Sequence, residues 1–125
     1  MPETLLPMPG FRVLVFPAEW ETIQNESAAL DLIGEALGRD AEAVVIPAER
    51  LGDDFFRLRT RVAGEIVQKF VTYRLLLVIV GDISRHVAAS SALRDFVHET
   101  NQGDHVWFLP GLGELEARLG RRAGV

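Results

Sequence analysis

The stretch Asp53–Gly103 decides the fold, and it reads DDFFRLRTRVAGEIVQKFVTYRLLLVIVGDISRHVAASSALRDFVHETNQG. Apolar residues recur every three or four positions from Asp53 to about Tyr73, which predicts one long amphipathic helix. The run Leu75–Val80 has no polar alternation, as is typical of a central strand that is covered on both faces. A polar turn opens at Gly81-Asp82, and a second helix is expected from residues 90–91 to near Gly103.

The rest of the chain continues this alternation of strands and helices. Strands alternating with helices over short connections indicate an α/β domain with a largely parallel sheet. We therefore expect a single domain over residues 1–125, with a four- to five-stranded, mostly parallel or mixed sheet, about four helices and a frayed tail at about 120–125. The other expected strands are Thr4–Met8, Arg12–Phe16, Ala43–Ile46 and His105–Leu109, and the other expected helices are Ala28–Leu37 and Gly113–Leu119.

Composition narrows the class of protein. The chain is 48% hydrophobic and 25% charged, as in ordinary globular domains. Its net charge of −5 argues against general binding of nucleic acids. The basic run of Arg57, Arg59 and Arg61 is interpreted as a solvated helix face, in preference to a phosphate or nucleic-acid site.

The chain carries no signal for a membrane or an oxidising compartment. No apolar run approaches the ~20 residues that span a bilayer, and Met1-Pro2-Glu3 lacks the positive charge of a secretory signal. The absence of cysteine excludes a disulfide framework, a thiol nucleophile and cysteine-based metal sites. A cytoplasmic location is the expectation.

Three blocks carry a resemblance to a known family. They are AGEIVQKF (Ala63–Phe70), VGD (Val80–Asp82) and LRDF followed by Glu-x-Asn-x-Gly (Leu93–Gly103). With them the chain resembles an uncharacterised bacterial family, domain-of-unknown-function family 4180, although Arg61 replaces the small residue of the family's pattern. The resemblance implies no activity.

The order of elements is also similar to the STAS fold of anti-anti-sigma factors and sulfate transporters. That resemblance implies a regulatory or protein-interaction module. In STAS domains a loop after a strand carries a phosphorylatable Ser or Thr at the start of a helix. The matching loop here, Pro47–Asp54, contains neither residue, so a phospho-switch at that position is not expected.

One candidate interaction face lies on the expected long helix. Thr60, Gly64 and Gln68 are spaced by four, with Glu65 and Lys69 in the next row, and both rows miss the apolar stripe. A glycine inside a helix costs about 1 kcal/mol relative to alanine, so a close approach of another backbone, a partner or a ligand would explain Gly64. Packing within the domain, a partner protein or second copy, and a ligand all stay open. Glu65 and Lys69 are expected to form an exposed ion pair.

A second candidate is the turn after the central strand. Ligands of open α/β sheets bind at the carboxyl ends of the strands, where Gly81, Asp82 and Ser84 are placed. The same residue types also form ordinary turns, and this interpretation is favoured. Thr60, Ser84 and Ser90 are candidate phosphorylation sites.

No sequence motif identifies a reaction. The chain lacks a nucleophile elbow, a phosphate-cradling glycine motif and a helical histidine pair, so neither a catalytic residue, a metal nor a cofactor is expected. The favoured hypothesis is a small regulatory or protein-interaction module with a protein partner or self-association. The alternative is a small-ligand-binding protein or an enzyme that uses the Gly81-Asp82 turn.

Overall fold

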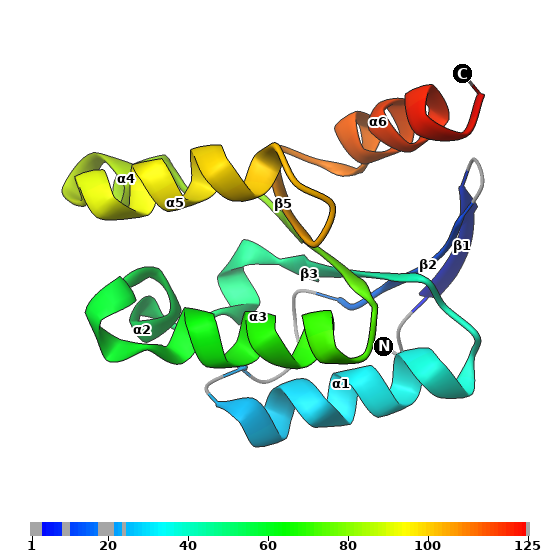
Figure 1. The fold of residues 1–125 in the computed structure, drawn as a ribbon, viewed down its shortest axis with the longest axis horizontal. Coiled ribbons are helices and arrows are strands. Elements are labelled where there is room, and N and C mark those ends of the chain that lie inside the picture. Colours follow the sequence, from blue (N-terminus) through cyan, green and yellow to red (C-terminus); the bar gives the residue numbers. More distant parts are fainter. Residues whose placement is uncertain (1–3, 9–10, 18–21, 24, 125) are drawn as a thin grey trace.

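The computed structural model describes residues 4–8, 11–17, 22–23 and 25–124. In this part of the chain it contains five strands, six α-helices and two single 3-10 turns (Figure 1). The strands are β1 (Thr4–Met8), β2 (Phe11–Val15), β3 (Ala43–Pro47), β4 (Leu76–Val80) and β5 (Val106–Leu109). The helices are α1 (Glu26–Gly38), α2 (Asp53–Phe56), α3 (Val62–Thr72), α4 (Ser84–Ala89), α5 (Ser91–Asn101) and α6 (Leu112–Gly124), and the 3-10 turns are η1 (Ala48–Arg50) and η2 (Leu58–Thr60).

The five strands form one sheet in the order β1-β2-β3-β4-β5, so each strand lies beside the strand that precedes it in the chain. Strands β2 to β5 are parallel, and β1 pairs antiparallel with β2. The expected α/β class is therefore confirmed, and so is the mixed, mostly parallel sheet. Helices α2 and α4 bring the number of α-helices above the four that were expected.

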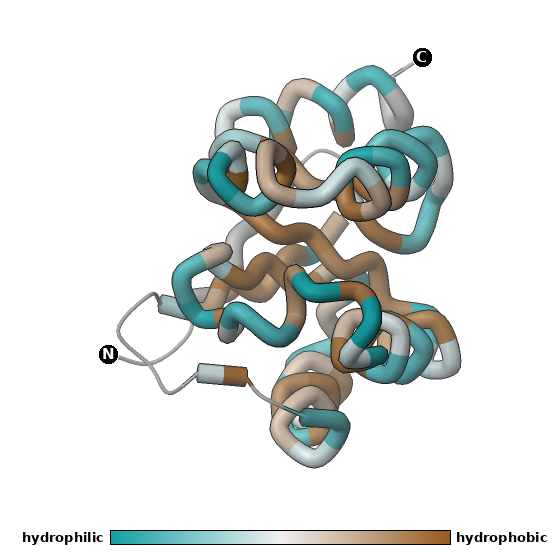
Figure 2. Tube along the Cα trace, turned by 90° about the vertical axis from the view of Figure 1, so that its left-hand side faces the viewer, coloured by the Kyte–Doolittle hydropathy of each residue, from teal (hydrophilic) through white to brown (hydrophobic). Residues whose placement is uncertain are grey.

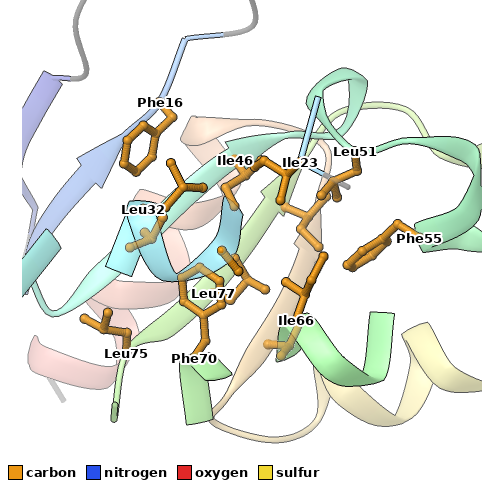
Figure 3. Packing of buried hydrophobic residues seen from close by; sticks show 14 of the residues in the cluster. Phe16, Ile23, Leu32, Ile46, Leu51, Phe55, Ile66, Phe70, Leu75 and Leu77 are labelled. Carbon is orange, nitrogen blue, oxygen red and sulfur yellow. The ribbon is translucent and has the colours of Figure 1, made fainter. Parts of the chain in front are cut away.

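The two faces of the sheet are covered unequally. The larger core joins one face to α1, α3 and α5, and Figure 3 shows part of it, with Phe70 and Ile66 of α3 close to Leu77 of β4. The other face, which includes Val78 and Trp107, packs against Leu115 and Leu119 of α6. Because strands added in one direction with right-handed crossovers place every crossover helix on the same side, only α6 remains for the second face. Figure 2 shows the strands as a hydrophobic band between the helices.

The expected long helix from Asp53 to Tyr73 is wrong, because the chain bends between α2 and α3. Arg61 has a φ of 68°, in the left-handed region that non-glycine residues rarely adopt, and this residue separates η2 from α3. The Thr60 hydroxyl donates to the backbone oxygens of Asp54 at 2.6 Å and Arg57 at 2.8 Å. These two bonds tie α2 to η2 and fix the bend.

The segment after β4 also differs from expectation. Residues 84–89 were expected to be part of a loop, but they form the short helix α4, which leads directly into α5. Ser90 begins α5 as its N-cap, and its side-chain oxygen accepts a hydrogen bond from the Leu93 backbone N–H at 3.1 Å. The last helix extends to Gly124, beyond the expected end at Leu119.

Asn101 closes the open edge of the sheet at β5. The carbonyls of His105 and Leu109 accept hydrogen bonds from Leu77 N–H of β4 and from Gly81 N–H just after it, so the backbone of Phe108 faces the opposite, unpaired edge. There the Asn101 side chain accepts from Phe108 N–H at 2.7 Å and donates to Phe108 C=O at 3.2 Å. A single side chain thus makes the two hydrogen bonds that a further strand would make.

Trp107 fixes the turn between α5 and β5 from the other face. Its indole N–H donates to the Gly103 carbonyl at 2.8 Å, and the Arg118 guanidinium of α6 lies 3.8 Å from its ring centroid. Asn101 and Gly103, both in the Glu-x-Asn-x-Gly block, therefore have structural roles. Trp107 is fully buried in the core.

Candidate functional site

The carboxyl ends of β3, β4 and β5 lie together at one end of the sheet, and the chain turns sharply there. Gly81, which follows β4, has a φ of 132°, and a Cβ at this position would lie 3.3 Å from the Cβ of Ala48 in η1. Both the backbone angle and this close approach require glycine. The turns after β3 and β4 are therefore in direct contact, which brings their polar side chains together.

Asp82 and Ser84 form the turn that leads into α4. The Asp82 carboxylate accepts a hydrogen bond from the Ser84 backbone N–H at 2.9 Å. Hydrogen bonds from the Ser84 side chain and backbone lower the pKa of Asp82 from its ordinary value, because they stabilise the ionised carboxylate. Both residues are exposed, and their expected role as turn formers is confirmed by this geometry.

Helix α4 places Arg85 and His86 against α2. The Arg85 guanidinium lies 3.4 Å from the Asp53 carboxylate. The His86 ring stacks on the buried Phe56 ring with 4.1 Å between centroids and 12° between planes. Burial, followed by the positive charge of Arg85, lowers the pKa of His86, and the opposing effect of Asp53 is smaller. At neutral pH the ring is therefore an uncharged surface beside a cation.

Three hollows open at this end of the sheet, and neighbouring hollows share lining residues. We therefore treat them together as the carboxyl-end groove. The arginine hollow, about 590 Å³, lies between the α2–η2 bend and α4 and contains Arg57, Arg59 and Arg85. The central hollow, also about 590 Å³, shares Asp53, Arg85 and His86 with it and adds Thr22, Glu49 and Asp82. The apolar hollow, about 440 Å³, shares Gly81 and Asp82 with the central one and is lined by Ile83, Val87, Val97 and Phe108.

The basic run 57–61 divides at the bend. Arg57 and Arg59 face the arginine hollow, whereas Arg61 is the left-handed residue before α3 and does not line it. The run does not form one α-helix face, because η2 interrupts the helix there, but its three arginines are exposed, as expected for solvated side chains. Arg57 also lies 3.7 Å from the Asp54 carboxylate.

The candidate face on α3 is smaller than the sequence suggested. Thr60 lies in η2, outside α3, and its hydroxyl is engaged by backbone carbonyls. Gly64 lies in the first turn of α3, and a Cβ there would meet no atom of the described chain within 4 Å. Close packing within the domain, one of the three explanations offered for Gly64, is therefore wrong for the described residues.

The remaining residues of that face are split between two roles. Glu65 and Gln68 are exposed, and the Gln68 amide lies 3.5 Å from the Thr72 hydroxyl. The Lys69 ammonium lies 3.2 Å from the Glu26 carboxylate of α1, in place of the expected pairing with Glu65. Lys69 thus joins α3 to α1, and Figure 1 shows these helices side by side.

Sequence reasoning missed several residues of the groove, chiefly Asp53, Phe56, Arg85 and His86. The pairings of Asp53 with Arg85 and of Phe56 with His86 connect positions about 30 residues apart, and no local pattern encodes them. The start of α2 was instead interpreted as part of one long amphipathic helix. The one available signal was the arginine run.

Arg50 lies in the core beneath the carboxyl ends of the strands. It is 3% exposed, the one charged side chain that is buried among the residues whose burial is described. Its guanidinium lies 5.6 Å from the centroid of the Phe16 ring, and burial lowers its pKa from the ordinary arginine value. Its backbone carbonyl accepts from Ile23 N–H at 2.7 Å, so Arg50 anchors η1.

Two further properties concern ions and membranes. In the residues that the structure describes, no group of three or more His, Asp or Glu side chains is arranged to hold a metal ion. Over the same residues, the helices are too short or too polar to cross a bilayer.

Comparison with known proteins places the chain in a family. No curated protein and no solved structure matches it. The family model described as a domain of unknown function, DUF4180, matches residues 9–119, which include every strand except β1 and nearly all of the groove's surroundings. The chain therefore belongs to the DUF4180 family of domains of unknown function.

Proposed function

We propose that this domain is a binding module whose small-molecule ligand occupies the carboxyl-end groove. The observation that carries the proposal is that neighbouring hollows along the strand ends share lining residues. Charged groups converge at one end of the groove and apolar side chains line the other. Ligand sites of α/β sheets occupy this position, and they combine apolar walls with a few placed polar groups.

The proposal includes a STAS-like arrangement. The order β2-α1-β3-α2/α3-β4-α4/α5-β5-α6 supports it, because each crossover carries helix after strand as the resemblance implies. In STAS domains the functional loop follows the strand that corresponds to β3. Here the residues after β3, including Glu49 and Asp53, line the central hollow. Both lines of reasoning therefore point to the same surface.

Chemical-shift mapping tests the proposal directly. The compounds to be titrated, one at a time, into ¹⁵N-labelled protein are sugars, amino acids, nucleotides and carboxylic acids. We expect at least one of them to shift the amide signals of residues 48–53 and 81–86. The exposed Glu49 offers a blocking variant, Glu49→Trp, which should abolish those shifts. Glu65→Trp, equally exposed on α3, is the matched control and should leave them unchanged. Ligands that shift only residues outside the groove would refute the proposal.

A second candidate function is association with a partner protein or a second copy through the exposed residues of α3. The open surface at Gly64 favours it, because an approaching backbone would meet no side chain there. The variant Gly64→Trp should then abolish complex formation in light scattering and pull-down while the monomer keeps its melting temperature. A complex that survives this substitution would remove the α3 face from consideration.

A further inference from the structure

We propose that the arginine hollow is an oxyanion subsite, which receives a phosphate or carboxylate group of the ligand. The inference rests on the proposed function of the carboxyl-end groove and gives the chemical class of its ligand. It follows from the charge of the hollow, the way its arginines are held, and the surface on which a ligand would lie.

The hollow is a local concentration of positive charge in an acidic protein. Its lining includes three arginines and one carboxylate, that of Asp53, which gives 3 − 1 = +2 with His86 neutral. The whole chain carries −5. Such a hollow attracts anions although the molecule as a whole is negatively charged. Its low-dielectric walls concentrate the electric field. All three arginines are exposed, and they line one depression.

The arginines reach the hollow from opposite sides. Arg57 and Arg59 come from the α2–η2 bend, which the Thr60 hydroxyl holds, and Arg85 comes from α4. The carboxylates of Asp54 and Asp53 lie 3.7 Å and 3.4 Å from Arg57 and Arg85. Each carboxylate engages only part of a guanidinium, which has five N–H donors. Within the described chain no ion pair of Arg59 is seen, so its donors face the hollow and solvent.

The floor of the hollow suits an anion that is part of a larger molecule. The stacked pair of Phe56 and His86 forms an apolar surface, and Ser90 contributes a hydroxyl at the rim. Burial is the main cause of the lowered pKa of His86, and the charge of Arg85 adds to it, against a smaller opposing effect of Asp53. Guanidinium groups recognise phosphate and carboxylate through paired hydrogen bonds, so these are the two classes of group that the subsite fits.

Inorganic pyrophosphate and citrate are the probes, one for each class of group. Each is titrated into ¹⁵N-labelled protein at low salt, and shifts are expected at residues 56–59 and 85–90, with weaker binding as NaCl is raised. Stronger binding of pyrophosphate would assign a phosphate ligand, and stronger binding of citrate a carboxylate. If neither probe perturbs these residues at concentrations up to millimolar, the inference is overturned.

Charge-removing variants locate the binding. Arg59→Gln and Arg85→Gln should each weaken the better probe about tenfold, which is the loss expected for one charge-assisted interaction. Arg94→Gln, on the exposed face of α5 outside the hollow, is the matched control and should change the affinity less than twofold. Equal weakening by all three variants would show non-specific attraction and refute the subsite.

The same probes separate this inference from the proposed function. If a neutral compound binds the central or apolar hollow while neither pyrophosphate nor citrate perturbs the arginine hollow, the groove is a binding site but the oxyanion inference fails. If pyrophosphate or citrate binds the arginine hollow while no compound enters the other hollows, the subsite stands and the wider groove proposal fails.

Discussion

Removing the Asn101 side chain should destabilise the domain by about 2 kcal/mol, within a range of roughly 1–3. In Asn101→Ala, the N–H and C=O of Phe108 lose hydrogen bonds of 2.7 Å and 3.2 Å. Each such bond contributes about 0.5–1.5 kcal/mol net, and unsatisfied groups cost more where water reaches them poorly. Phe108 is 6% exposed, so water replaces the lost partner only in part.

Urea unfolding followed by circular dichroism and tryptophan fluorescence measures this loss. The fluorescence probe is well placed, because Trp107 is buried next to Phe108 in β5. For a chain of this size, 2 kcal/mol corresponds to a fall in melting temperature of roughly 6–10 °C. An unchanged urea m-value would show that the compactness of the folded and unfolded states is preserved.

Gln102→Ala is the control for this experiment. Gln102 is the exposed neighbour of Asn101, and its amide contacts only the His98 ring, at 2.9 Å, among the hydrogen bonds described. Its removal should change the free energy of unfolding by less than about 0.5 kcal/mol. A loss below 0.5 kcal/mol in Asn101→Ala, or an equal loss in both variants, would show that the edge of the sheet does not depend on this side chain.

Four other substitutions test the backbone and the groove. Gly64→Ala should raise the free energy of unfolding by about 0.5–1 kcal/mol, because the added Cβ meets only open space. Gly81→Ala should lower the free energy of unfolding by about 1–3 kcal/mol, because of the positive φ and the contact with Ala48. Thermal unfolding of the two variants distinguishes these opposite signs. Arg61→Gly should raise it by about 1 kcal/mol by relieving the left-handed conformation, and an unchanged or lower stability would contradict that reasoning. The pKa of His86 is lowered in the folded state, so the unfolded chain binds a proton first and stability falls as the pH drops below about 6.5, until the folded-state pKa is passed. The stability difference between wild type and His86→Gln, measured from pH 8 to 5, should therefore shift in favour of the variant on acidification, and a difference independent of pH would show that His86 is not the responsible group.

The sequence predicted the strands well and the helices partly. Strand signals are local, since β-branched runs such as AVVI and LLLVIV need only their own composition to be recognised. The break between α2 and α3 was missed because Phe55, Leu58, Val62 and Ile66 keep helical spacing through it. The bend depends on the Thr60 hydroxyl and on the left-handed Arg61, and apolar periodicity encodes neither.

The sequence predicted the place of the candidate site in the fold better than it predicted the residues that form the site. The rule that ligands bind at strand carboxyl ends led to the Gly81-Asp82 turn, and Gly81 and Asp82 line two of the three hollows, the central and the apolar one. The charged groups that give the groove its character come from α2 and α4, and they meet only through tertiary contacts between distant segments. A single sequence contains no pattern from which such a meeting can be deduced.

The strictly consecutive strand order has a consequence for how this protein is made. Each strand from β2 onward pairs with the strand just synthesised, so the sheet can grow in step with the ribosome and wait for no distant segment. Among the described elements, α6 contacts both β1 and β5 and covers the second face. A nascent chain therefore keeps one apolar face of its sheet uncovered until α6 has been synthesised, and a chain that stops before α6 should be a preferred substrate for chaperones.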